Sequence, residues 1–149
     1  MKKVLIIQSI FYKKIAILLL EGATTELKRR NVQYEIITVP GAFEIPAAVA
    51  IANKAKKYTG YVALGCVIRG ETTHYDYVCQ ESARGLNDLA ITKRLAIGNG
   101  ILTTENEDQA IKRADPKQNN KGGVVASACA EMIQLKEMMG YSDTKKRRK

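Results

Sequence analysis

Residues 61–74 read YVALGCVIRGETTH. Almost every side chain of residues 61–68 is apolar, and a strand that is apolar along its whole length is typical of a parallel sheet covered on both faces. The polar residues 69–74 follow immediately, and parallel sheets bind their ligands beyond the carboxyl ends of their strands. The stretch therefore predicts a central parallel strand that leads directly into a candidate ligand site.

On both sides of this strand, short β-rich runs alternate with stretches whose apolar residues recur at helical spacing. The other expected strands cover residues 4–8, 34–39 and 95–102. The expected helices cover residues 15–27, 42–57, 75–89, 104–114 and 123–139. Thr104 and Glu107 form the S/T-x-x-E signature of a helix start. This order predicts one α/β domain over residues 1–140, a sandwich built on a parallel sheet.

The formal net charge of the 149 residues is +9, and the last five residues, KKRRK, are all positive. We expect residues 141–149 to form a disordered basic tail. Such a tail can contact nucleic acid or anionic lipid, but a solvated end that aids solubility is the simpler interpretation. We therefore expect neither a nucleic-acid partner nor a membrane partner.

The length of the apolar runs and the number and spacing of the cysteines indicate where the protein works and whether it holds a metal. No apolar run approaches the roughly 20 residues that a membrane span needs, so we expect a soluble cytoplasmic protein. The chain has three cysteines and one histidine and lacks a C-x-x-C pair. This pattern predicts reduced thiols and no metal site.

The carboxyl-end rule selects four stretches as ligand-binding candidates: residues 9–12, 40–46, 69–74 and 103–106. His74, the only histidine, ends the third of them. An imidazole accepts and donates protons readily near neutral pH, so His74 is the candidate for proton transfer. Asp76 could orient this imidazole, but it follows His74 by two positions on the expected helix and can instead point elsewhere.

Gly65 and Gly70 have the spacing of a phosphate loop. Glu71-Thr72 stands where that loop has Lys-Ser/Thr, and the missing lysine excludes a nucleoside triphosphate loop. A more general anion site at a helix start remains. Thr72 and Thr73 can equally be simple helix caps.

Other side chains have both a chemical and a structural interpretation. Phe11 can stack on a planar ring or fill the core, and Glu44 can face a helix dipole or accept a hydrogen bond from a substrate hydroxyl. Arg113, Lys117 and Lys121 surround a helix break. Arginine offers a planar fork for phosphate, although a solvated basic surface is the simpler interpretation there.

Several segments resemble the motifs of the 6,7-dimethyl-8-ribityllumazine synthase family. They are, in the order of that family, VPGAFEIP at residues 39–46, GCVIRGETTHYDYV at 65–78, GILTTEN at 100–106 and NKG at 120–122. The resemblance covers about residues 4–139, and the segment around His74 is its most specific part.

The resemblance implies a flavodoxin-like fold, a three-layer sandwich of a four-stranded parallel sheet with helices on both faces. It also implies a cofactor-free transferase of riboflavin biosynthesis. Such an enzyme condenses 5-amino-6-(ribitylamino)uracil with 3,4-dihydroxy-2-butanone 4-phosphate, releases phosphate and forms 6,7-dimethyl-8-ribityllumazine. Ordering of the two substrates and proton transfer would then account for the rate.

The resemblance also implies which residues bind the pyrimidine substrate. Phe11 matches the aromatic residue that stacks on the ring, and Phe43 and Glu44 match the pair that holds the ring edge and the ribityl chain. The strand end that lines the uracil pocket corresponds to Cys66, Val67 and Ile68.

The phosphate side of the site is implied in the same way. Gly70, Glu71 and Thr72 match the turn that receives the phosphate, and His74 matches the proton-transfer histidine. The neighbouring subunit of a homo-oligomer would contribute a phosphate-binding arginine and a lysine, which correspond to Arg113 and Lys121.

Two departures from the family pattern bear on affinity and assembly. Asn99 stands where members often have a phenylalanine that covers the pyrimidine from the neighbour. Only three residues precede the first strand, and residues 115–119 depart from the pattern of shell-forming members. We therefore favour a homopentamer with a head-to-tail interface over a sixty-subunit shell. An association with riboflavin synthase is a further expectation.

Three alternatives stay open. A flavodoxin-like protein could carry a flavin or lumazine without turnover, and a basic protein could bind nucleic acid through its tail. An archaeal-type riboflavin synthase shares the fold, but the segment around His74 disfavours it.

Overall fold

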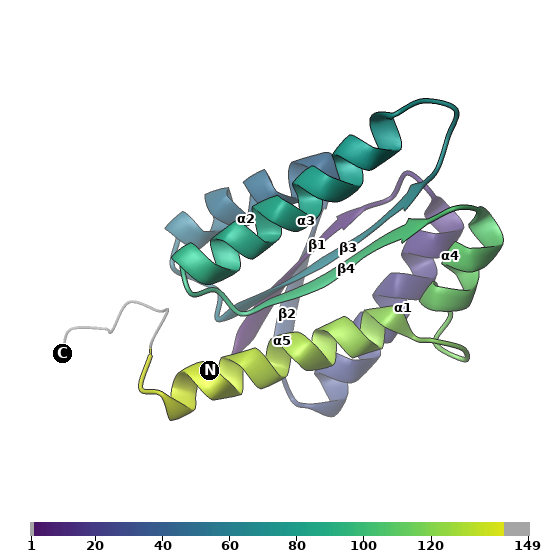
Figure 1. Cartoon of the computed structure of the whole chain (residues 1–149). Coiled ribbons are helices and arrows are strands. Elements are labelled where there is room, and N and C mark those ends of the chain that lie inside the picture. The colour runs from purple at the N-terminus through teal and green to yellow at the C-terminus, as the bar shows by residue number, and fades with distance from the viewer. Residues whose placement is uncertain (1, 142–149) are drawn as a thin grey trace.

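The computed structural model describes residues 2–141 (Figure 1). The elements in this part of the chain are β1 Lys3–Ser9, α1 Lys13–Arg29, β2 Gln33–Val39, the 3-10 turn η1 Ala42–Glu44, α2 Ile45–Lys54, β3 Gly60–Ile68, α3 His74–Thr92, β4 Ile97–Thr104, α4 Glu107–Ala114 and α5 Lys121–Met138. The predicted order of strands and helices is confirmed. Apart from Tyr141, the predicted basic tail lies outside the described residues.

The four strands form one parallel sheet in the order β2-β1-β3-β4. β3 is an inner strand, and its residues Tyr61, Val62, Ala63 and Leu64 are at most 1% exposed. Successive side chains of a strand point to opposite faces, so a strand covered on both sides must be apolar at every position. This explains the unbroken apolar run in β3.

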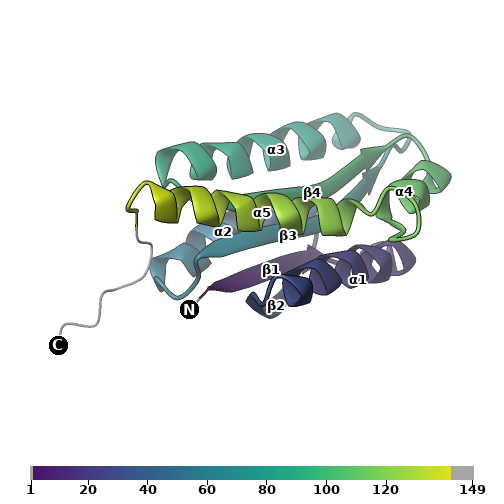
Figure 2. The ribbon, with the colours of Figure 1, turned by 90° about the horizontal axis from the view of Figure 1, so that it is seen from below.

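Helices cover both faces of the sheet, as Figures 1 and 2 show. On one face, α1, α4 and α5 enclose a core that includes Leu19, Val62 and Val125. On the other face, α2 and α3 enclose a core that includes Ile45 and Tyr61. The predicted fold class, a three-layer α/β sandwich with a four-stranded parallel sheet, is confirmed. Within residues 2–141, no helix is long and apolar enough to cross a membrane.

Helix α5 lies backbone to backbone against both β4 and α1. A Cβ atom on Gly98 of β4 would lie 2.1 Å from the carbonyl oxygen of Val125, and one on Gly122 would lie 2.1 Å from that of Leu19. No side chain fits in either place, so both positions require glycine. We call these two contacts the glycine seam. It fixes the start of α5 on the sheet and on α1.

The predicted start of the fourth helix is wrong. Thr104 is the last residue of β4, where it pairs with Ile68, and α4 begins only at Glu107. Asn106 caps the helix instead, because its side chain accepts a hydrogen bond from the backbone N–H of Gln109 at 2.9 Å.

The helix predicted for residues 42–57 is also shorter and divided. Residues 42–44 form η1, and α2 ends at Lys54. Pro46 lies in the first turn of α2, where helices tolerate a missing N–H. The turn before Pro46 places residues 42–44 at the carboxyl edge of the sheet, where the candidate site lies.

Candidate functional site

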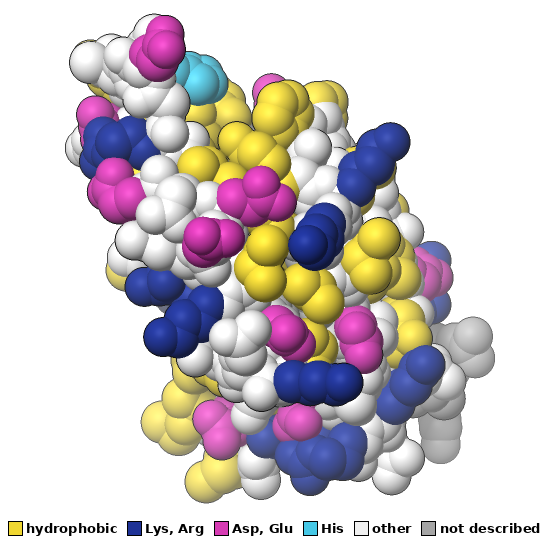
Figure 3. All heavy atoms as spheres, turned by 90° about the vertical axis from the view of Figure 1, so that its right-hand side faces the viewer, with side chains coloured by type: hydrophobic (Ala, Val, Ile, Leu, Met, Phe, Trp, Pro, Cys, Tyr) yellow, Lys and Arg dark blue, Asp and Glu magenta, His cyan; other side chains and the backbone are white. Residues whose placement is uncertain are grey.

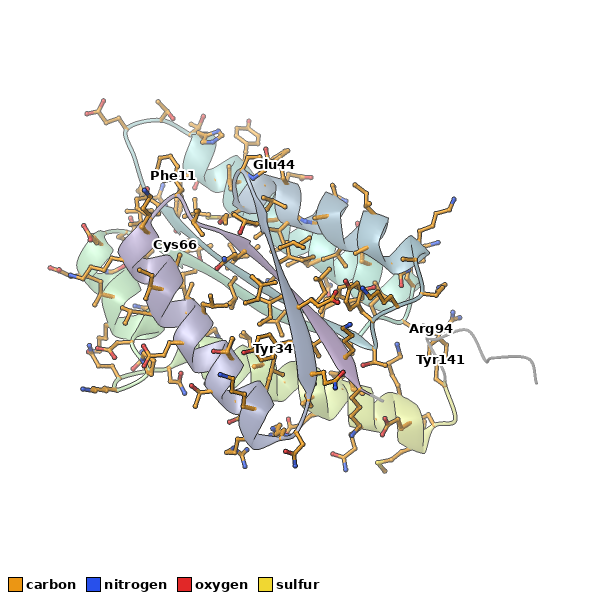
Figure 4. The ribbon with its side chains drawn as sticks, turned by 180° about the vertical axis from the view of Figure 1, so that it is seen from behind. Phe11, Tyr34, Glu44, Cys66, Arg94 and Tyr141 are labelled. Carbon is orange, nitrogen blue, oxygen red and sulfur yellow. The ribbon has the colours of Figure 1, made fainter. Side chains whose placement is uncertain are left out.

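A pocket of about 540 Å³ opens at the carboxyl edge of the sheet. The segments that follow β1, β2 and β3 form its walls, as expected for a parallel sheet. In Figure 4, Phe11, Glu44 and Cys66 lie at this end of the sheet, and Arg94 and Tyr141 lie at the opposite end. The lining residues are Ser9, Phe11, Tyr12, Pro40, Gly41, Ala42, Phe43, Glu44, Cys66, Val67, Ile68, Gly70, Thr72, His74, Tyr75 and Val78.

Most of the residues predicted for the site line this one pocket. They come from segments far apart in the chain, and they are Phe11, Phe43, Glu44, Cys66, Val67, Ile68, Gly70, Thr72 and His74. Glu71 belongs to the same turn as Gly70 and Thr72 and is exposed, but it does not line the pocket.

Two aromatic rings stand at the pocket with much of their surface in solvent. Phe11 is 78% exposed and Phe43 is 54% exposed. The Phe11 ring meets the Tyr12 ring edge-on, with 5.0 Å between the centroids, and this contact leaves most of the Phe11 ring open. Exposed aromatic faces beside an apolar strand end suit a planar heterocyclic ligand.

The floor of the pocket is the apolar end of β3. Burial, followed by the neighbouring Cys79 and Glu107, raises the pKa of the Cys66 thiol to about 12. Cys66 is therefore a neutral thiol at physiological pH. It can pack against a ring, but it lacks the thiolate that nucleophilic catalysis requires.

The turn between β3 and α3 leads to the start of a helix. His74 is the first residue of α3, and its backbone N–H donates a hydrogen bond to Oγ1 of Thr72 at 3.3 Å. Thr73 occupies the N-cap position, but its side chain makes no capping hydrogen bond. The N-terminus of a 19-residue helix thus faces the pocket at Thr72 and His74, a suitable place for an anion.

The His74 side chain carries no hydrogen bond or ion pair to any residue between 2 and 141. Asp76, the candidate for orienting it, instead pairs with Arg69, with 3.4 Å between Oδ1 and the guanidinium nitrogen. The imidazole therefore stands at the rim of the pocket without a carboxylate partner. Figure 3 looks onto this edge and shows the histidine beside a band of hydrophobic side chains.

Three predicted residues lie away from the pocket of their own chain: Asn99, Arg113 and Lys121. Asn99 is exposed on β4, and its side-chain oxygen accepts a hydrogen bond from the N–H of Ile101 at 3.0 Å. Arg113 is exposed on α4 and donates to the backbone oxygen of Gln109 at 3.3 Å. Lys121 begins α5. A single chain does not bring these three side chains to the pocket.

Several lining residues were not singled out in the sequence. Ser9, Tyr12 and the segment 40–42 fall in stretches that the carboxyl-end rule selects, so their signal was position. Tyr75 and Val78 were missed altogether. They follow His74 by one and four residues, and helical spacing from His74 could have indicated Val78.

Among residues 2–141, no three His, Cys, Asp or Glu side chains come close enough to hold a metal ion. The residues that line the pocket offer aromatic stacking, hydrogen bonding, anion binding at a helix start and proton transfer at one imidazole.

Sequence comparisons with known proteins agree on one family. The family model for 6,7-dimethyl-8-ribityllumazine synthase matches residues 1–137. A 6,7-dimethyl-8-ribityllumazine synthase of Bartonella tribocorum is 56% identical over 138 residues, which cover 92% of this chain and 91% of that protein. A synthase of the same name from Novosphingobium aromaticivorans is 51% identical, with 92% of this chain and 98% of that protein covered.

Proposed function

The chain belongs to the 6,7-dimethyl-8-ribityllumazine synthase family, and from this premise we propose how its pocket carries out the reaction of that family. The proposed reaction condenses 5-amino-6-(ribitylamino)uracil with 3,4-dihydroxy-2-butanone 4-phosphate in riboflavin biosynthesis. The products are 6,7-dimethyl-8-ribityllumazine, inorganic phosphate and water. The observation that carries the proposal is the joint presence of exposed aromatic rings, an apolar floor and a helix start with His74 in one pocket.

The pyrimidine substrate is proposed to occupy the side of the pocket formed by the segments after β1 and β2. Phe11 stacks on the ring, while Phe43 and Glu44 hold its edge and the ribityl chain. Val67 and Ile68, with the neutral thiol of Cys66, pack beneath the ring. A carboxylate beside a polyol chain can accept hydrogen bonds from its hydroxyl groups.

The phosphate substrate is proposed to occupy the start of α3. Gly70 leaves open space at its Cα, with no atom within 4 Å of an added Cβ, so a ligand can approach the backbone there. Thr72 offers a hydroxyl group, Glu71 completes the turn, and the helix dipole favours the phosphate charge.

The reaction needs several proton transfers, and His74 is the group placed to make them. The 5-amino group attacks the ketone and loses water to form a Schiff base, and phosphate then leaves from the four-carbon unit. Loss of phosphate, together with the proton on the neighbouring hydroxyl-bearing carbon, leaves an enol that tautomerises to a new carbonyl. The amine that carries the ribityl chain attacks this new carbonyl and loses a second water, which closes the ring. Orientation of two substrates in one pocket supplies most of the rate, and His74 assists the proton transfers.

We further propose that the working site is shared between neighbouring subunits of a homo-oligomer. Arg113 would bind the phosphate and Lys121 would lie beside it, both from the neighbour, and Asn99 would face the pyrimidine. None of the three lines the pocket of its own chain, which supports this arrangement. A head-to-tail interface closes into a ring, and we favour a pentamer in the cytoplasm over a sixty-subunit shell, with riboflavin synthase as a further partner.

Mixing the two substrates with micromolar protein tests the activity. We expect the absorbance and fluorescence of the lumazine product to appear. Tight lumazine binding without turnover would support the non-catalytic alternative, a flavodoxin-like carrier. Light scattering of the same sample distinguishes a pentamer from a shell.

Co-expression of His74→Ala and Arg113→Ala chains tests the shared site. If each site takes its histidine and its arginine from different chains, random mixing restores about a quarter of the sites. Activity no higher than the mean of the two separate variants would refute a shared site.

A further inference from the structure

Arg69 ties together three elements at the edge of the pocket. Its Nε donates to Oε2 of Glu105 beyond β4 at 2.7 Å, and its Nη1 lies 3.4 Å from Oδ1 of Asp76 in the first turn of α3. Its guanidinium carbon lies 4.3 Å from the centroid of the Tyr75 ring. The backbone N–H of Arg69 also donates to the carbonyl oxygen of Thr104 at 2.9 Å.

These contacts engage two nitrogens and one face of the guanidinium. Its edges meet the two carboxylates, and its face lies over an aromatic ring, an arrangement that a planar cation stabilises well. Arg69 does not line the pocket, but Tyr75, on which it stacks, does. The positive charge of Arg69 is thus engaged with protein carboxylates rather than presented to a ligand.

Residues 75 and 76 directly follow the candidate proton-transfer residue, His74. The imidazole itself has no side-chain partner in residues 2–141 to hold it in place. Its position therefore depends on the backbone of the turn that carries it. Arg69 holds this turn at both ends, because it begins the turn and its guanidinium contacts the side chains of Tyr75 and Asp76 beyond the end of the turn.

We infer that Arg69 is a positioning residue for the condensation, which fixes the His74 turn and the Tyr75 wall of the pocket by clamping them to the end of β4 through Glu105. The inference rests on the proposed function. Arg69, Glu105 and Asp76 are all partly exposed, and exposed ion pairs contribute little to the free energy of unfolding. Removing the clamp should therefore disturb the local geometry of the site while the fold remains intact.

Steady-state kinetics with Arg69→Met and Glu105→Gln test the clamp. Each variant should lower kcat by roughly tenfold, because small displacements of a reacting group are costly, with small changes in the KM for either substrate. The double variant should be little worse than either single one, since both remove the same contact. Arg84→Met is the matched control. Arg84 pairs with Glu81 and Asp88 within α3, and its loss should leave kcat unchanged.

Two kinetic outcomes would overturn the inference. If Arg69 bound the phosphate directly, Arg69→Met would raise the KM for the phosphate substrate alone and Glu105→Gln would have no effect. If the contact were merely structural, each loss of activity would follow a loss of thermal stability. Arg84→Met would then lose as much activity as Arg69→Met for the same loss of thermal stability.

A spectroscopic measurement separates this inference from the proposed function. His74 is the only histidine, so histidine labelled at the ring carbon Cε1 gives one NMR signal that needs no substrate or turnover. The signal should shift or broaden in Arg69→Met and Glu105→Gln and stay unchanged in Arg84→Met. An unchanged signal in Arg69→Met would overturn the positioning role even if the unmodified protein were fully active. Absence of lumazine synthesis by the unmodified protein would overturn the proposed function, and the NMR result would still decide whether Arg69 fixes the turn.

Discussion

Truncation of Phe11 to alanine should separate the binding of substrate from the stability of the fold. The ring is 78% exposed, so folding removes from water only on the order of 40 Å² of the roughly 200 Å² of such a side chain. At about 25 cal/mol per Å², the free energy of unfolding should fall by only about 1 kcal/mol. A pyrimidine stacked on the ring would lose about 1–3 kcal/mol of binding free energy.

In kinetic terms, the KM for the pyrimidine substrate should rise roughly 5- to 150-fold in Phe11→Ala. The KM for the phosphate substrate should change much less. Urea denaturation gives the stability, and steady-state rates with each substrate varied in turn give the two KM values. Tyr77→Ala is the matched control, because Tyr77 is also largely exposed, at 64%, and does not line the pocket. An equal rise of both KM values, or an unchanged pyrimidine KM, would refute the stacking role of Phe11.

Three further outcomes follow from single side chains. His74→Ala should lower kcat by about 10²- to 10⁴-fold without abolishing turnover; a wild-type kcat, or none at all, would contradict the division between proton transfer and substrate ordering. Gly98→Val should lower the free energy of unfolding in urea by at least about 1–3 kcal/mol, because its Cβ would lie 2.1 Å from the oxygen of Val125; an unchanged midpoint would mean that the seam yields. Donation by Lys3, and by two further donors, holds the pKa of Glu35 at about 2, below its ordinary 4.5. The stabilisation from the ionised Glu35 carboxylate is thus complete above about pH 4.5 and is lost as the pH falls towards 2. In this window, the stability of Glu35→Gln in acid unfolding, followed by circular dichroism, should depend less on pH than that of the unmodified protein. Equal slopes for the two proteins would argue against these contacts.

The fold could be predicted from the sequence because its central signal is nearly free of ambiguity. The apolar run in β3 has no polar face, and only a strand covered on both sides accounts for it. Element boundaries were less accessible. The Thr104 and Glu107 pair fits a helix start as a local pattern, but pairing of Thr104 with Ile68 extends β4 past it. Local sequence contains no trace of that contact between strands.

The candidate site could likewise be predicted only in part from the sequence. Positions at strand ends, such as Phe11 and His74, could be predicted because the topology of a parallel sheet brings them to one edge. The partner of Asp76 could not, because the choice between His74 and Arg69 depends on where two side chains point. The roles of Arg113 and Lys121 stay predictions, since they depend on how a second chain docks.

The glycine seam has a consequence for how this protein can change over time. The two glycines of the seam lie directly against the main-chain atoms of Leu19 and Val125. Even a slightly larger residue at either glycine would therefore clash with the backbone. Phe11 and Phe43, by contrast, are largely exposed and contribute little to folding. Substitutions that change substrate preference should therefore be tolerated most easily at Phe11 and Phe43. A directed-evolution library confined to these exposed pocket residues should keep a far larger share of folded members than one that includes the glycine seam.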